Sequence, residues 1–218
     1  MENILKTVDI TKKFSKKVAV SAVNMNIKKG DIYGFIGRNG AGKTTLLTNI
    51  EDELKKVNIP VFQYSEHFDG RHMTDKAAAK GDMSFVATSV CSSEGENINL
   101  NLCKVISQLR EFIKEGTFSR SEVVTSTERW ILFDAIDSGY SIDNIIELKA
   151  IFNLMLEDAK TSGVQLYIIV SANSYELASN ENCFDIINGE YVAFNSYEDY
   201  KQFILDSRKL KDERYKES

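Results

Sequence analysis

The sequence predicts an α/β domain in which a mostly parallel sheet is flanked by helices, and two patterns support this. Short runs that are nearly all apolar, such as residues 130–133 and 167–170, are typical of strands buried on both faces. These runs alternate with segments of helical periodicity, as in domains whose helices cover a parallel sheet. The length of 218 residues, with 43% apolar and 27% charged residues, favours one globular domain with a substantial core.

The N-terminal part of the chain predicts a strand layer, a buried strand and then a helix. Residues 3–10 and 18–27 alternate apolar and polar positions, which is typical of half-exposed antiparallel strands. Residues 32–36 are almost entirely apolar and predict a buried strand. Five of the twelve glycines lie within residues 30–42, and apolar residues at helical spacing over 44–57 predict a helix after them.

The rest of the chain continues the alternation of strands and helices. Residues 65–83 are polar and lack periodicity, so no regular element is expected there. The remaining segments predict a strand at 61–64, an amphipathic helix at 98–113, a strand at 130–133, a helix at 142–160, a strand at 165–170, a hairpin at 185–192 with an Asn-Gly turn, and a helix at 196–214.

Composition argues against several functions and locations. The apolar runs are far shorter than the roughly 20 residues of a membrane helix, and the N-terminus lacks the pattern of a signal peptide. Cys91, Cys103 and Cys183 share no metal-ligand spacing, which predicts reduced thiols in a cytoplasmic protein. The net charge is −5, and residues 1–48 carry +6. These basic residues are scattered without interleaved aromatic rings, so no nucleic-acid binding is predicted.

The glycine-rich segment fits the phosphate-loop pattern G-x-x-x-x-G-K-[ST] (Walker A) at every position. Its residues are Gly37, Arg38, Asn39, Gly40, Ala41, Gly42, Lys43 and Thr44. The glycines let successive backbone N–H groups surround a phosphate at the positive end of the following helix. The lysine would reach the β and γ phosphates, and the threonine hydroxyl would ligate Mg²⁺. The flanking strand and helix favour this interpretation over a chance glycine-rich turn.

A nucleoside triphosphate site also needs a carboxylate for the metal, and Asp134 is the candidate. It follows the apolar residues 130–133 at the end of a predicted buried strand. The alternative is a solvated aspartate after an ordinary core strand. Together, Thr44 and Asp134 predict a Mg²⁺ site next to the phosphate loop.

These motifs resemble the ATP-binding cassette (ABC) superfamily of ATPases. The first third of the chain resembles a transporter nucleotide-binding subunit, and the resemblance is carried by residues 8–14, 18–20, 22–25 and 34–46. Residues 131–141 are similar to the family's Walker B strand and the loop that follows it. The second half is more similar to compact ABC-type ATPases of phage and mobile elements.

The resemblance implies that residues 1–218 form one P-loop ATPase domain. The antiparallel strands and phosphate loop would occupy 1–48, a shortened helical insertion 65–128, and the Walker B strand and C-terminal part 129–218. Gln63 would take the part of the family's Q-loop glutamine, although it comes early in the chain.

The resemblance also implies further contacts to the nucleotide. Phe14 stands where the family stacks an aromatic ring on adenine, with a place in the core as the alternative. Thr45 continues the phosphate-loop segment. Ser93 and Gly95 resemble a degenerate signature motif, which contacts the γ phosphate across a dimer interface. A helix-capping turn is the competing interpretation of Ser93, and both stay open.

Two departures from the family pattern bear on hydrolysis. The position after the predicted metal ligand, where the family has its catalytic glutamate, is Ala135, and a methyl group cannot orient or polarise water. Asn173 lies near the position where transporters place a histidine that senses the γ phosphate. We take Lys43 and Asp137 as the catalytic candidates, with Asp143 as a second acid that would substitute for the missing glutamate.

Three functions therefore stay open from sequence. The first is an ATPase that binds Mg-ATP, hydrolyses it slowly and forms an ATP-dependent homodimer. The second is a non-hydrolysing nucleotide switch that recruits a partner. The third is the ATP-binding subunit of an ABC exporter, which would be held at the membrane by a membrane-protein partner. A cytoplasmic location is expected for each, and GTP is not separated from ATP by these motifs.

Overall fold

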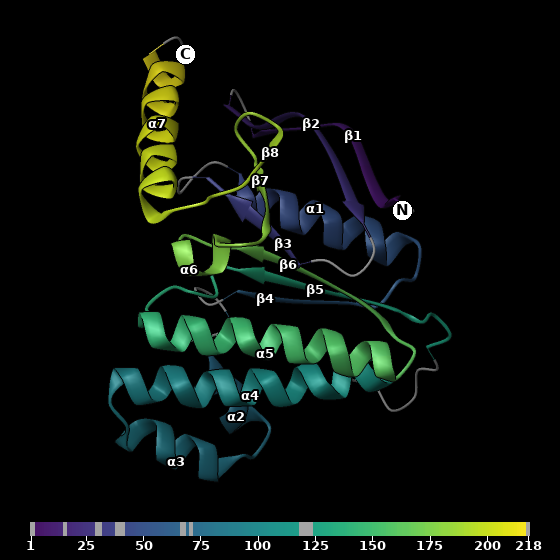
Figure 1. The fold of residues 1–218 in the computed structure, drawn as a ribbon. Coiled ribbons are helices and arrows are strands. Elements are labelled where there is room, and N and C mark those ends of the chain that lie inside the picture. Colours follow the sequence, from purple (N-terminus) through teal and green to yellow (C-terminus); the bar gives the residue numbers. More distant parts are fainter. Residues whose placement is uncertain are drawn as a thin grey trace.

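A six-stranded, mostly parallel sheet and a two-stranded antiparallel sheet form the framework of the molecule (Figure 1). The structure is a computed structural model, which describes residues 3–14, 17–28, 32–37, 42–65, 69, 72–117 and 124–216. The small sheet pairs β1 (Asn3–Phe14) with β2 (Lys17–Lys28). The large sheet has the order β4-β5-β6-β3-β7-β8. Its strands are β3 (Ile32–Ile36), β4 (Val61–Ser65), β5 (Glu128–Asp134), β6 (Gln165–Ser171), β7 (Asn182–Asp185) and β8 (Glu190–Val192).

Helices cover both faces of the large sheet. Figure 1 shows α1 on one face and the paired helices α4 and α5 on the other. The helices are α1 (Lys43–Lys56), α2 (Met73–Ala79), α3 (Met83–Cys91), α4 (Glu94–Glu115), α5 (Ile142–Thr161), α6 (Tyr175–Ala178) and α7 (Tyr197–Lys216). The predicted fold class, with its antiparallel strand layer and mostly parallel sheet, is confirmed.

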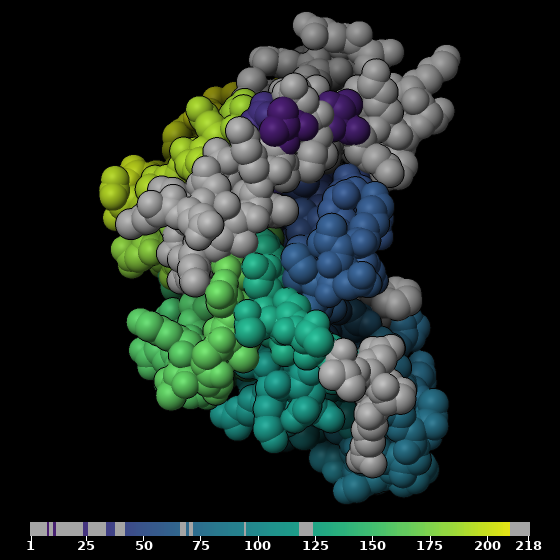
Figure 2. Space-filling model, turned by 90° about the vertical axis from the view of Figure 1, so that its right-hand side faces the viewer, coloured from purple at the N-terminus to yellow at the C-terminus, as the bar shows by residue number. Residues whose placement is uncertain are grey.

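Two hydrophobic cores explain why the central strands are apolar at every position. Along β5, Trp130 and Leu132 pack into the core beneath α1, whereas Ile131 and Phe133 pack into the core beneath α4 and α5. Consecutive side chains of a strand point to opposite faces, so a strand covered on both sides needs an apolar residue at each position. Figure 2 shows α1, in blue, between parts of the N-terminal strands, in purple, and the teal and green second half.

The expectation of an irregular segment at 65–83 is wrong, because α2 and the start of α3 lie there. Of the seven residues of α2, Met73 and Ala77 are the buried ones. In α3 the buried residue is Ser89, which is polar. Such short helices with one or two buried positions leave no apolar stripe for sequence periodicity to detect. The start of α4 at Glu94 is four residues before the predicted start for a similar reason, because its first turn is polar.

The C-terminal region follows its prediction. β7 and β8 form the expected hairpin, and Gly189 in its turn has a positive φ of 74°. α7 follows and packs Tyr200 against Phe194, with their rings 5.1 Å apart. Within the described residues, no helix is both long enough and apolar enough to cross a membrane.

Candidate functional site

The predicted phosphate-loop and metal residues gather at the carboxyl ends of three neighbouring strands. β3 leads into Gly37, β5 ends at Asp134 and β6 ends at Ser171. The three strands are adjacent and parallel, so these ends share one edge of the sheet. Ligands of open α/β sheets bind at this edge. α1 also begins here, with Lys43 as its first residue.

Two glycines of the motif have the backbone conformation for which glycine is needed. Gly37 and Gly42 have positive φ values of 138° and 101°, and Gly42 is the N-cap of α1. The first turn of α1 carries no acidic residue, so no negative side chain offsets the partial positive charge of the free N–H groups at the start of the helix. Arg38, Asn39, Gly40 and Ala41 lie outside the described residues, and their contacts to phosphate stay a prediction.

Lys43 is buried in this site and is held by two oxygen atoms. Its Nζ donates to the carbonyl of Gly37 at 2.5 Å and to Oδ1 of Asn173 at 3.1 Å. Burial lowers the pKa of Lys43 below its ordinary value of 10.5, and the nearby carboxylates of Asp134 and Asp137 oppose that shift. Both hydrogen-bond acceptors of the ammonium group are neutral oxygens, so its positive charge is not neutralised by a direct ion pair and can attract an anion.

Thr44 and Asp134 are in direct contact. The Thr44 hydroxyl donates to Oδ2 of Asp134 at 2.8 Å, and Asp134 is buried. The sequence predicted these two residues as metal ligands without fixing their separation. Thr45, also named in the motif, is half-buried in the first turn of α1.

Of the two acids considered as substitutes for the missing glutamate, Asp137 faces the site. It is buried, and its Oδ2 accepts the backbone N–H of Asn173 at 2.8 Å. Its Oδ1 is buried without a hydrogen-bond partner among the described residues. Asp143 is instead exposed in the first turn of α5, where a hydrogen bond from Ser141 lowers its pKa.

Ala135 has an unusual backbone conformation for an alanine. Its φ is +52°, in the left-handed region, and its N–H donates to the carbonyl of Ser171 at 3.0 Å. The residue is buried. The position next to Asp134 is therefore inside the site, and it offers a methyl group there.

Ser93 caps α4, which is one of the two roles that the sequence left open. Its hydroxyl accepts the N–H of Glu96, and the Glu96 carboxylate accepts the N–H of Ser93 at 2.7 Å, which completes a capping box. Gly95 is exposed in the first turn. Gly139, in the loop after Asp137, lies beside Ile98 of the same helix. The contact of Ser93 and Gly95 with a γ phosphate stays a prediction.

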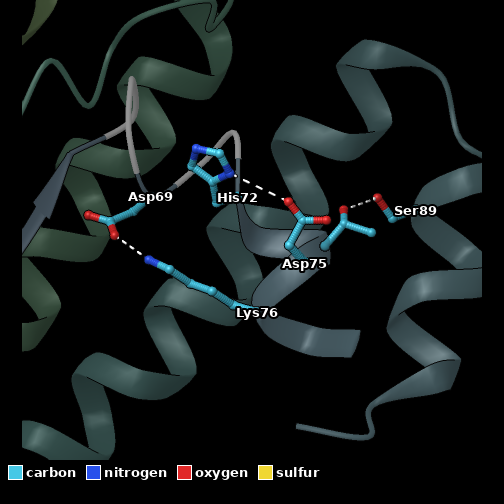
Figure 3. Close-up of polar contacts among 6 residues, drawn as sticks. Asp69, His72, Asp75, Lys76 and Ser89 are labelled. Atoms are coloured by element: carbon cyan, nitrogen blue, oxygen red, sulfur yellow. Dashed lines mark hydrogen bonds and ion pairs between the residues drawn. The ribbon is translucent and has the colours of Figure 1, made fainter. Parts of the chain in front are cut away.

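A chain of polar contacts fixes the Ser93 turn to α2 and α3. The Ser89 hydroxyl lies 2.9 Å from that of Thr74 and donates to Oδ1 of Asn97 at 2.6 Å. Figure 3 shows Ser89 facing α2, the helix of Asp75 and Lys76. The Asn97 amide in turn donates to the carbonyls of Ser89 and Ser92. The helical insertion therefore holds the turn in place through side chains that sequence reasoning had not singled out.

Three further residues complete the comparison with the sequence. Phe14 is the last residue of β1, but its side chain lies outside what the structure describes, so adenine stacking stays a prediction. Gln63 lies inside β4, and Ser65 is the residue paired with Asp134. Asn173 is a contact residue for which the sequence gives only a weak signal, because it is the third residue after the apolar run that ends at Val170.

Comparison with known proteins agrees with this geometry. The family model described as ABC transporter matches residues 20–150, which is more than half of the chain. The fold and the site define an ATP-binding cassette. The chain belongs to the ABC transporter family.

Individual relatives match mainly over shorter stretches. The bacitracin transport ATP-binding protein BcrA of Bacillus licheniformis is 43% identical over 68 residues, which cover 31% of this chain and 22% of that protein. The lantibiotic transport ATP-binding protein SrtF of Streptococcus pyogenes is 32% identical over 77 residues, which cover 35% of this chain and 31% of that protein. The chain thus spans less than a third of either relative.

Solved structures share the fold. CbiO1 from Clostridium perfringens, part of the ABC transporter complex CbiONQ, has a TM-score of 0.50 at 15% identity, with 88% of each chain covered. The ADP conformation of MJ1267, an ATP-binding cassette of an ABC transporter, also has a TM-score of 0.50 at 16% identity, covering 94% of this chain and 96% of that one.

Proposed function

We propose that the chain binds Mg-ATP through Lys43, Thr44 and Asp134, hydrolyses it slowly and uses it to control dimerisation. The convergence of a buried ammonium group, a hydroxyl and a carboxylate at the start of α1 carries the proposal. Membership of the ABC transporter family supports ATP as the nucleotide.

The oxygen atoms of Thr44 and Asp134 fit a magnesium ion. Mg²⁺ prefers octahedral oxygen ligands at about 2.0–2.1 Å, which places adjacent ligands about 2.9 Å apart. The separation of 2.8 Å between Thr44 Oγ1 and Asp134 Oδ2 is close to that spacing. When bound, the ion would neutralise charge on the phosphates. Among the described residues no cluster of three His, Cys, Asp or Glu side chains could hold a metal, so phosphate and water would complete the shell.

Lys43 changes partners when the nucleotide binds. Its hydrogen bonds to Gly37 and Asn173 are made to neutral oxygens, and a charged phosphate oxygen is a stronger acceptor than either. The phosphate also favours the protonated form of the lysine, whose pKa burial lowers. The exchange releases the Asn173 side chain, whose contact with Lys43 links the segment after β6 to the start of α1.

Asp137 is the acid that could accept a proton from an attacking water. Its Oδ1 has no partner among the described residues, whereas Oδ2 is held by the Asn173 N–H. This arrangement orients the carboxylate and leaves one oxygen available. Because Ala135 supplies no second acid beside Asp134, we expect turnover to be slow.

A non-hydrolysing switch is the second candidate, and Ala135 is the observation that favours it. If Asp137 does not act as a base, the site would bind Mg-ATP and close without turnover. In either case the Ser93 turn would meet the γ phosphate of a second copy, which couples the nucleotide to dimerisation. The transport names of the BcrA and SrtF relatives support an exporter as the setting, with a membrane-protein partner at the cytoplasmic face.

The test is nucleotide binding by calorimetry, with turnover measured on the same samples. Lys43→Ala should weaken Mg-ATP binding by about 30-fold or more, since it removes a hydrogen bond to a charged group. Lys55→Ala, on the exposed side of the same helix, is the matched control and should bind as the unmodified chain does. Equal affinity in Lys43→Ala and the control would refute the proposal. Tight binding without turnover would select the switch over the ATPase.

A further inference from the structure

The first turns of α7 pack against the segment that carries Asn173. The rings of Tyr200 and Tyr175 lie 5.9 Å apart, and Tyr175 is the first residue of α6, two positions after Asn173. Figure 1 shows α6 next to the start of α7. The Phe194 ring lies 5.1 Å from that of Tyr200, which is only 5% exposed. Tyr200 is therefore fixed in an aromatic cluster that borders the Asn173 segment.

The same cluster reaches the strand that leads into the phosphate loop. Ile36, the last residue of β3, directly precedes Gly37 and is buried in one cluster with Tyr200. Ala178, the last residue of α6, belongs to this cluster as well. Close-packed interiors leave little room for independent movement of their side chains. α7 therefore supports the loops after β3 and β6, both of which contribute to the nucleotide site.

The other end of α6 is held by α5. Lys149 donates from Nζ to the carbonyl of Glu176 at 3.2 Å and to that of Ser179. It also pairs with Glu181 at 3.1 Å. These contacts fix the C-terminal side of α6, whereas the contact with α7 is made at its first residue. Tyr175 is therefore the point at which α7 acts on the Asn173 segment.

Asn173 links this segment to the acid in the site. Its N–H donates to Oδ2 of Asp137 at 2.8 Å. Burial raises the pKa of Tyr200, and the Asp137 carboxylate raises it further, so the phenol is neutral and lies within range of that charge. The Tyr200 hydroxyl has no hydrogen-bond partner among the described residues. The contacts of Tyr200 are thus made by its ring.

We propose that Tyr200 is a positioning residue for the nucleotide site, whose ring holds Tyr175 and thereby keeps the Asn173 N–H on the Asp137 carboxylate. Without the ring the carboxylate would be free to rotate, and a general base acts only within hydrogen-bond reach of its proton. The effect on turnover rests on the proposed function, in which Asp137 accepts a proton from water. The effect on the Asn173 N–H does not.

The first test is hydrogen exchange on the full chain without nucleotide. Tyr200→Leu should speed exchange at the Asn173 amide about tenfold, because it removes the ring pair with Tyr175. Phe203→Leu is the matched control, since Phe203 packs against Phe194 at 5.3 Å and has no ring contact with Tyr175 among the described residues. It should leave this exchange unchanged. Equal exchange rates in the two variants would overturn the proposal.

Two further variants separate positioning from folding. Tyr200→Phe keeps the ring and removes only a buried hydroxyl without a partner, so it should be at least as stable as the unmodified chain and keep the slow exchange. Tyr175→Leu removes the same ring pair from its half-buried side, and should speed the Asn173 exchange even where Tyr200→Leu does not fold. Slow exchange in Tyr175→Leu would overturn the proposal.

The second test is steady-state ATP turnover by the same variants. Tyr200→Leu should lower kcat about tenfold, because the base is no longer oriented. Its KM should not rise, since Lys43 exchanges Asn173 for phosphate when the nucleotide binds. A raised KM with unchanged kcat would overturn the proposal, as it would indicate general loosening of the site. Absence of turnover in the unmodified chain would refute hydrolysis itself, and the exchange result would then decide the role of Tyr200.

Discussion

The hydroxyl of Thr44 donates to the carboxylate of Asp134 at 2.8 Å, across 90 positions of the sequence. Thr44 belongs to the first turn of α1, and Asp134 is the last residue of β5. The contact joins the start of α1 to the end of β5, the strand that carries the proposed metal ligand. The contact therefore holds two of the residues proposed to bind Mg-ATP next to each other.

This contact predicts that Asp134→Asn acts on magnesium binding. The variant keeps a hydrogen-bond acceptor for Thr44 but loses the negative charge that a divalent ion requires. Nucleotide affinity measured with Mg²⁺ should fall about tenfold or more, and affinity measured with EDTA should change much less. Asp52→Asn, on the exposed face of α1, is the matched control. Equal losses with and without the metal would remove Asp134 from the metal shell.

Lys43→Met should raise stability while it abolishes nucleotide binding. Lys43 is buried, and its ammonium group is held by neutral oxygens rather than by a paired carboxylate. Methionine fills similar space without the cost of burying a charge. We expect a gain of about 1 kcal/mol in the free energy of unfolding, a size common for substitutions that trade function for stability. Chemical denaturation measures it, and lower stability in the variant would contradict the prediction.

The stability gain should also depend on pH in a defined direction. The pKa of Lys43 is lowered in the folded chain, so between that value and 10.5 the unfolded chain binds more protons than the folded one. In that window the stability of the unmodified chain rises with pH. The advantage of Lys43→Met should therefore be greatest below the folded pKa and shrink as the pH approaches 10.5. A stability gain of Lys43→Met that grew with pH would contradict the view that the gain comes from removing a buried charge.

Ala135→Glu tests whether the water-activating position is the missing part. A well-placed general base contributes about 100-fold or more to the rate. The variant should hydrolyse ATP faster than the unmodified chain, whereas Ala135→Gln, similar in size but without the base, should not. Ala135 already carries a Cβ at a φ of +52°, so neither variant adds a new cost from this backbone conformation. An unchanged rate in Ala135→Glu would mean that Asp137 already supplies the base or that the site does not close.

The sequence predicted the parts of the site whose signal is local. The glycine spacing of the phosphate loop and the four apolar residues before Asp134 are local patterns, and both place their residues correctly at the ends of β3 and β5. Lys43 contacts Asn173 and Asp137 contacts the Asn173 backbone only because β6 lies between β5 and β3. The order of strands in a sheet leaves no periodicity in the sequence, so these contacts required the structure.

The helical insertion was harder to predict for a different reason. α2 and α3 are held by polar contacts and by very few apolar residues, so hydrophobic periodicity carries no signal there. The capping box at Ser93 could be seen in the sequence as a serine followed by a glutamate three residues later. The contact between Ser89 and Asn97, which holds this turn, could not be seen in the sequence, because it joins α3 to α4.

Ser89→Ala should destabilise the helical insertion. The Ser89 hydroxyl is buried between Thr74 and Asn97, and its removal leaves Oδ1 of Asn97 without that donor. A buried group left without its partner costs about 1–3 kcal/mol, which denaturation would measure. Ser107→Ala, an exposed serine on α4 that bonds its own helix, should change stability by less than about 0.5 kcal/mol. Equal stability of the two variants would show that the Ser89 contacts do not hold the turn.

The three cysteines should separate into two reactive thiols and one unreactive thiol in the folded chain. Cys91 and Cys103 are exposed, whereas Cys183 is fully buried and donates to the carbonyl of Ala178. Burial raises the pKa of Cys183 to about 12, with a further rise from Glu181 that Lys149 partly opposes. At pH 8 the thiolate, which is the reactive form, is therefore almost absent at this position.

A disulfide reagent at pH 8 should therefore titrate two thiols quickly in the native protein and the third only after denaturant is added. In Cys183→Ala the count should be two under both conditions, which assigns the slow thiol. Fast reaction of all three thiols in the native chain would mean that the packing of Cys183 beside Gly34, on β3 next to the phosphate loop, opens readily. Slow reaction would instead show that the packing between β7 and β3 stays closed in the native chain.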